Sequence, residues 1–82
     1  MRPDDLLEFL RRRPFEPFRL NLSDGTTYDV RHPEMMMVGR SRALIGIAAA
    51  EQPFVFDKVD SVALLHITRL EPLPPQAEPI SN

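Results

Sequence analysis

Two histidines are the side chains of this sequence best suited to proton transfer or metal binding. His32 stands between Asp29 and Glu34, and His66 follows two leucines near the C-terminal end. An imidazole beside a carboxylate can form an acid–base pair or bind a metal ion. We interpret His32 instead as a loop residue that caps a turn before Pro33, and His66 as a buried, hydrogen-bonded structural residue. The sequence therefore predicts no metal site and no cofactor.

Hydrolase and nucleotide chemistry have weaker candidates. Each of three serines could be combined with a histidine and an aspartate, but none lies in the context of a nucleophile elbow: Ser23, Ser41 and Ser61. The three glycines are too far apart for a phosphate-binding loop: Gly25, Gly39 and Gly46. We therefore expect no enzyme activity and no nucleotide site.

Arginines form two groups that could contact nucleic acid: Arg11, Arg12 and Arg13, and Arg40 and Arg42. Basic residues and aromatic rings together are typical of proteins that bind single strands. The aromatic residues, however, fall mostly at predicted core positions. The net charge is −2, and the first group is explained by the preference of a helix C-terminus for positive charge. We favour a solvated arginine surface and keep binding of RNA or DNA as the alternative.

Consecutive apolar residues indicate a surface for self-association. In the segments 35–38, 44–47 and 62–65 the apolar side chains do not alternate with polar ones, so both faces of these strands are apolar. One short helix cannot cover all of them, and open strand edges offer backbone hydrogen bonds as well. The sequence predicts a homo-oligomer, and a protein partner, with the candidate surface Met35, Met37, Leu44, Ile45 and Ile47.

The elements that position these residues fit into one small domain. The chain has 82 residues and no cysteine, so its stability must come from packing or from a partner subunit. We expect a single helix-plus-barrel domain over 1–71 and a proline-rich mobile tail over 72–82, where Pro72 and Pro75 have the spacing of a PxxP ligand. We also expect a cytoplasmic protein, because no signal peptide or membrane-spanning stretch is evident.

A helix of about ten residues is predicted at the N-terminus. Pro3 suits a first helical turn, Asp4 and Asp5 favour its positive end, and Pro14 ends it. Its apolar residues follow the i, i+3, i+4 spacing of a single face, so the helix must dock on the rest of the domain.

A hairpin follows, and its register can be derived. A two-residue turn would pair Leu20 with Asp29 and mix the two faces. A three-residue turn over 23–25, with Gly25 in the left-handed conformation, pairs Leu20 with Tyr28 and Phe18 with Val30. All apolar side chains then share one face, and we predict this register.

The remaining strands are shorter and less regular. We predict a third strand over 35–38, a fourth over 43–47, a loop over 48–53 and a fifth region over 54–63. Alternation resumes only at Ile67, which predicts a tight 3-10 turn over 64–66. The fold class expected is mainly β with one N-terminal α-helix, as a small five-stranded antiparallel barrel.

The order of these elements over residues 4–71 resembles the Sm-like fold of Sm, LSm and Hfq proteins, one of the SH3-like barrels. The stretch Leu22-Ser23-Asp24-Gly25 with Tyr28 is similar to the first half of the Sm signature. The chain departs from the family at its base-binding loops: Asp29-Val30 replaces a glycine, and His32 to Met35 replaces an acidic loop with Met-Asn. No Arg-Gly pair follows the fourth strand. The resemblance implies an Sm- or SH3-like barrel and not the RNA site.

The sequence pattern "RPFxPFRxxLxDG…HPE…LLHITRLE" resembles a family of small bacterial proteins more closely than it resembles the Sm-like proteins. Here it covers Arg13 to Gly25, His32 to Glu34 and Leu64 to Glu71. This resemblance implies no activity. The function expected is a non-catalytic interaction or structural module, and the alternative is an Sm-like protein that binds nucleic acid through its arginines.

Overall fold

The computed structural model describes residues 1–49 and 52–74 of the chain. Within these residues, one helix, α1 (Pro3–Leu10), precedes six strands. The strands are β1 (Phe18–Leu22), β2 (Thr27–Val30), β3 (Met36–Val38), β4 (Arg42–Ala49), β5 (Gln52–Ala63) and β6 (Ile67–Pro72). Two 3-10 turns, η1 (Pro33–Met35) and η2 (Leu64–His66), interrupt them. The class predicted, mainly β with one N-terminal helix, is confirmed.

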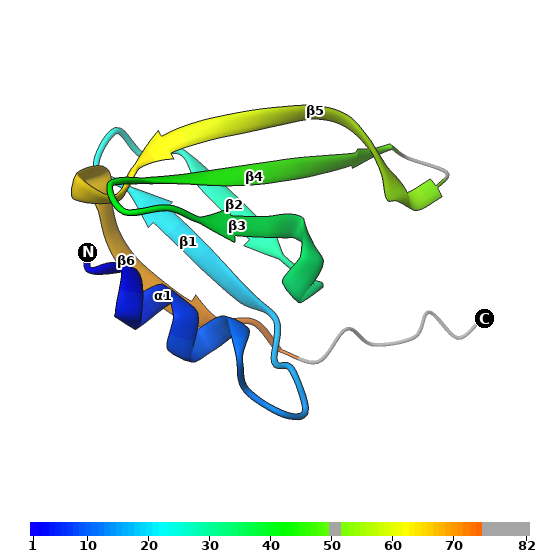
Figure 1. Cartoon of the computed structure of the whole chain (residues 1–82), viewed down its shortest axis with the longest axis horizontal. Helices are drawn as coiled ribbons and strands as arrows, with labels where there is room; N and C mark the ends of the chain where they lie inside the picture. Colours follow the sequence, from blue (N-terminus) through cyan, green and yellow to red (C-terminus); the bar gives the residue numbers. More distant parts are fainter. Residues whose placement is uncertain (50–51, 75–82) are drawn as a thin grey trace.

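The strands form two antiparallel sheets of three, with the orders β2-β1-β6 and β3-β4-β5 (Figure 1). The prediction of five strands in a closed barrel is wrong on both counts. A sixth strand arises because η2 separates β5 from β6 and places them in different sheets. Pro33 lacks a backbone donor, and the turn η1 that it begins separates β2 from β3, which belong to different sheets.

The first hairpin has the register derived from the sequence. Leu20 pairs with Tyr28 and Phe18 pairs with Val30, and the Leu22 N–H donates to the Thr26 carbonyl at 2.9 Å. Gly25 has φ +91°, in the left-handed region that favours glycine. The Asp24 carboxylate accepts a hydrogen bond from the Thr26 N–H at 2.9 Å and fixes the turn.

The second hairpin is longer than predicted. The predicted loop over 48–53 is largely strand, because Ala48 pairs with Phe56 and Ala49 pairs with Gln52. Two register shifts, after Ile47 and after Ala48, let the pairing continue past the point where alternation fails in the sequence. The hairpin β4–β5 therefore extends beyond the rest of the molecule (Figure 1).

The core lies between the inward faces of the two sheets. It consists of Leu6, Leu10, Phe18, Leu20, Val30, Met36, Ala43, Ile45, Val62, Leu64 and Ile67. Helix α1 contributes Leu6 and Leu10. The Phe9 and Phe18 rings pack edge to face, with their centroids 5.2 Å apart. The helix thus docks on the domain, as its spacing predicted.

The predicted tail begins inside the domain. Strand β6 ends at Pro72, opposite Phe18, and the Leu73 N–H donates to the Pro17 carbonyl at 3.0 Å. The rest of the tail, including Pro75 and with it the PxxP spacing, lies outside the described residues.

Candidate functional site

The outward face of the sheet β3-β4-β5 exposes several large apolar side chains. Met37 pairs with Leu44, and Val59 pairs with Gly46. Opposed residues of antiparallel strands point to the same side of a sheet, and alternation along β4 places this side opposite the buried Ile45. Met37, Leu44 and Val59 therefore share the outward face.

A fourth apolar residue joins this face through the irregular end of the hairpin. The register shift after Ile47 pairs Phe56 with Ala48, which lies on the outward side. The Phe56 ring covers Gly46 so closely that a Cβ atom on this glycine would lie 2.9 Å from the ring carbons Cγ and Cδ1. We call these four residues the apolar face, and their exposed fractions are 68% for Met37, 41% for Leu44, 36% for Phe56 and 58% for Val59.

The outward face of the other sheet is polar, and its charges are paired. Arg19 lies opposite Asp29 and donates from Nε to Oδ1 at 2.7 Å and from Nη2 to Oδ2 at 3.2 Å. The Arg19 guanidinium lowers the pKa of Asp29 through these hydrogen bonds. The Asn21 amide donates to the Glu71 carboxylate at 3.1 Å. The two sheets thus present opposite surfaces: one has paired charges suited to water, and the other is apolar.

The predicted oligomer surface is split by the structure. Met37 and Leu44 lie on the apolar face, whereas Ile45 is 1% exposed and belongs to the core. Met35 and Ile47 are partly buried against that core. The sequence reasoning missed Phe56 and Val59. Val59 could have been found from strand alternation, because it lies two residues from Ser61 and so points to the opposite side of the sheet from the buried Val62. Phe56 could not, because a register shift decides which side of the sheet it faces.

The first arginine group surrounds the end of α1, and its members contact their own segment. The Arg12 guanidinium lies 4.2 Å from the centre of the Phe9 ring and 3.5 Å from the Glu16 carboxylate. Arg13 donates from Nη1 to the carbonyls of Leu10 and Arg12. Arg11 is exposed.

Of the second group, Arg40 lies in the turn between β3 and β4, and Arg42 begins β4. Arg40 is exposed, and Arg42 donates from Nε to the Ser61 hydroxyl at 2.8 Å. Figure 1 shows this turn at the end of the molecule where the chain begins, whereas the end of α1 lies toward the other end. The structure therefore does not bring the two arginine groups together.

The histidines are both exposed. His32 begins the turn η1, and its carbonyl accepts a hydrogen bond from the Met35 N–H at 3.0 Å. His66 was expected to be buried, and this is wrong: the η2 turn directs Leu64 into the core but leaves Leu65 and His66 outside. Among the described residues, no group of three His, Cys, Asp or Glu side chains could hold a metal ion.

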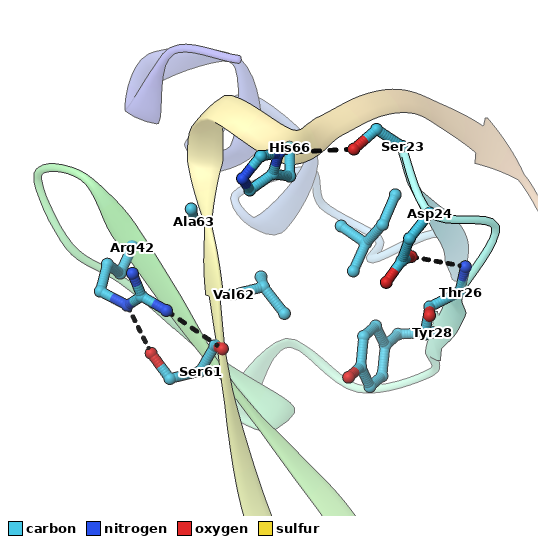
Figure 2. A pocket seen from close by; sticks show the side chains of 10 residues that line it. Ser23, Asp24, Thr26, Tyr28, Arg42, Ser61, Val62, Ala63 and His66 are labelled. Atoms are coloured by element: carbon cyan, nitrogen blue, oxygen red, sulfur yellow. Dashed lines mark hydrogen bonds between the residues drawn. The ribbon is translucent and has the colours of Figure 1, made fainter.

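His66 borders a hollow of about 500 Å³ between the β1–β2 turn and β5, which we call the turn hollow (Figure 2). His66 Nδ1 lies 3.4 Å from the Ser23 hydroxyl, and the Ser23 N–H donates to the His66 carbonyl at 2.8 Å. The lining is completed by Leu22, Asp24, Thr26, Tyr28, Arg42, Ser61, Val62 and Ala63.

Tyr28 connects the two sheets at one side of this hollow. Its hydroxyl donates to the Asp60 carboxylate of β5 at 2.7 Å. This hydrogen bond, with burial and the charge of Asp60, raises the pKa of Tyr28 to about 12. A side-chain hydrogen bond thus joins β2 to β5, two strands of different sheets. No pattern in the sequence indicated this pair.

A scan against protein-family models, a search of curated proteins and a search of solved structures each find no match to this chain. Within residues 1–49 and 52–74, no helix has the length and apolar character needed to cross a membrane.

Proposed function

We propose that this chain is a small interaction module that self-associates through the apolar face. The observation that carries the proposal is the contrast between the two outward sheet faces. Arginine, asparagine and carboxylate side chains pair with one another on the sheet β2-β1-β6, but Met37, Leu44, Phe56 and Val59 lie exposed on the sheet β3-β4-β5. A contiguous apolar patch on a small protein is typical of a surface that another molecule covers.

The partner favoured is a second copy of the chain. A two-fold axis brings the same patch of both copies together, so the patch must complement itself. The apolar face carries no charge among its four members, so two copies can meet without charge repulsion. Arg42, which begins β4 two residues before Leu44, donates to Ser61 within the same chain. Burial of apolar area contributes about 25 cal/mol per Å² to such an association.

The geometry suits packing of one sheet on another. The Phe56 ring lies directly against Gly46 of β4. Met37 and Val59 lie on the neighbouring strands β3 and β5. Sheets that pack face to face bury side chains of this kind between them. The proposed assembly is therefore a dimer in which the apolar face is the interface.

Light scattering and analytical ultracentrifugation over a range of concentrations test this. We expect a mass of twice the 9.4 kDa chain, falling to one chain on dilution. Val59→Lys and Met37→Lys place charges in the interface and should weaken the dimer at least about tenfold. Leu65→Lys is the matched control, because Leu65 is 82% exposed but lies in η2, away from the face. A wild-type monomer throughout the range, or equal weakening by the control, would contradict the proposal.

A further inference from the structure

None of the four residues of the apolar face lines the turn hollow. One wall comes from the β1–β2 turn and the other from β5, with η2 closing one end. Figure 2 shows the Val62 side chain pointing into the hollow, with Asp24 and Tyr28 on the wall that faces it. The hollow therefore has an apolar side and a polar, aromatic side.

Asp24 is the carboxylate that faces the interior (Figure 2). The Thr26 N–H donates a hydrogen bond to Asp24 Oδ1 at 2.9 Å, and this bond keeps the side chain in that orientation. An aspartate is ordinarily ionised at neutral pH, and the hydrogen bonds to Thr26 lower the pKa of Asp24 further. A fixed and ionised carboxylate favours a cationic ligand.

Arg42, a cation that lines the hollow, is hydrogen-bonded to Ser61 rather than to this carboxylate. Arg42 lies on the other side of the β5 ribbon from Asp24 in Figure 2, where it donates from Nε to the Ser61 hydroxyl and from Nη2 to the Ser61 carbonyl. Those bonds hold the Arg42 guanidinium at the rim of the hollow. The interior keeps the negative charge of Asp24.

Tyr28 adds an aromatic ring beside the carboxylate. Its hydroxyl donates to Asp60, which keeps the ring in place between the two sheets. Aromatic rings attract guanidinium groups through their electron-rich faces, and planar guanidinium also stacks on them. Leu22 and Val62 supply apolar contacts for an aliphatic stem.

We propose that the turn hollow binds the arginine side chain of a protein partner. The guanidinium would pair with Asp24 beside the Tyr28 ring, and the aliphatic part of the side chain would cover Leu22 and Val62. The hydroxyls of Ser23 and Thr26 on the same wall can accept further N–H bonds. This binding does not depend on self-association, because it uses none of the four residues of the apolar face.

Titration of the isotope-labelled full chain with the peptide acetyl-Gly-Arg-Gly-amide, followed by NMR, tests the proposal. We expect amide shifts confined to residues 22–28 and 61–66. The same peptide with citrulline in place of arginine keeps the shape and loses the charge, and it should bind at least about tenfold more weakly. A lysine peptide should bind more weakly than the arginine peptide, because an ammonium does not stack.

Variants of the chain complete the test. Asp24→Asn keeps the side-chain acceptor of the turn but removes the charge, and it should weaken arginine binding about tenfold. Asp57→Asn, at an exposed acid on β5 outside the hollow, should leave binding unchanged. Equal binding of the arginine and citrulline peptides, no effect of Asp24→Asn, or shifts at the apolar face instead would each overturn the proposal. Val59→Lys should retain the peptide site, so failure of the dimer and failure of this site can be told apart.

Discussion

At the scale of single residues, two glycines are explained by different physical demands. Gly25 is required by its backbone, because its φ of +91° lies in a region that side chains rarely adopt, while its surroundings are open. Gly46 is required by its neighbour, because any Cβ would displace the Phe56 ring. The first supports the turn that carries Asp24, and the second supports the shape of the apolar face.

Replacing Gly25 tests the backbone argument. Gly25→Ala should lower the free energy of unfolding by about 1 kcal/mol, because alanine is strained in the left-handed region. Gly25→Asn should cost less, since asparagine tolerates this conformation better. Nothing lies within 4 Å of the added Cβ, so crowding cannot account for a difference between the variants. Urea unfolding measures both, and equal losses would refute the backbone explanation.

At the scale of elements, α1 depends on its docked face. The helix has only eight residues, which is too short to be stable alone. Leu6 and Leu10 are buried, and the N-terminal ammonium donates to the Leu64 carbonyl at 3.1 Å. These contacts fasten the helix to the core and to η2, the turn that also carries His66.

Truncation of one leucine measures the docking of the helix. Leu6 is 0% exposed, so Leu6→Ala should lower the free energy of unfolding by about 2 to 4 kcal/mol through lost burial and a residual cavity. Leu7→Ala is the neighbouring control, because Leu7 is only partly buried and should cost about 1 kcal/mol or less. Chemical unfolding followed by circular dichroism gives both values. Similar losses at the two positions would contradict the docked arrangement.

Local pattern was sufficient to predict elements where alternation was strict. Phe18, Leu20 and Leu22 alternate with polar residues, so only one turn length puts them on the face of Tyr28 and Val30, and that register is confirmed. The 3-10 turn at 64–66 was also predicted correctly, from the break in alternation before Ile67. The strand residues 48–49 and 52–53 were missed because the alanines and proline there do not alternate with polar residues, and their pairing depends on two register shifts.

At the scale of the whole molecule, the candidate surfaces were beyond sequence reasoning because distant residues form them. Ser23 meets His66, and Tyr28 meets Asp60, across separations of 43 and 32 residues. Whether an apolar residue such as Met37 or Ile45 is exposed depends on which sheet covers its face. The sequence correctly predicted exposed apolar residues on these strands, Met37 and Leu44 among them, but not that Ile45 is buried or that Phe56 and Val59 are exposed.

The Tyr28–Asp60 hydrogen bond connects the two sheets of the fold. Tyr28 lies on β2 and Asp60 on β5, and these strands belong to different sheets. Removing the hydroxyl by Tyr28→Phe keeps the ring but leaves a partly buried carboxylate with one donor fewer. We expect a loss of about 1 kcal/mol at neutral pH, measured by urea unfolding.

The same bond makes the stability of the fold depend on pH in the alkaline range. Tyr28 has a pKa of about 12 in the folded chain against an ordinary 10.0, so below pH 10 its contribution is fully present. Between pH 10 and about 12 the unfolded chain loses this proton while the folded chain keeps it, and the free energy of unfolding must fall as pH rises.

Tyr28 is the only tyrosine and tryptophan is absent, so the ultraviolet absorbance of tyrosinate reports this group alone. We expect its ionisation to be delayed in the native chain and not in denaturant. In Tyr28→Phe the decline of stability over this interval should be smaller, and an unchanged decline would show that Tyr28 is not its cause.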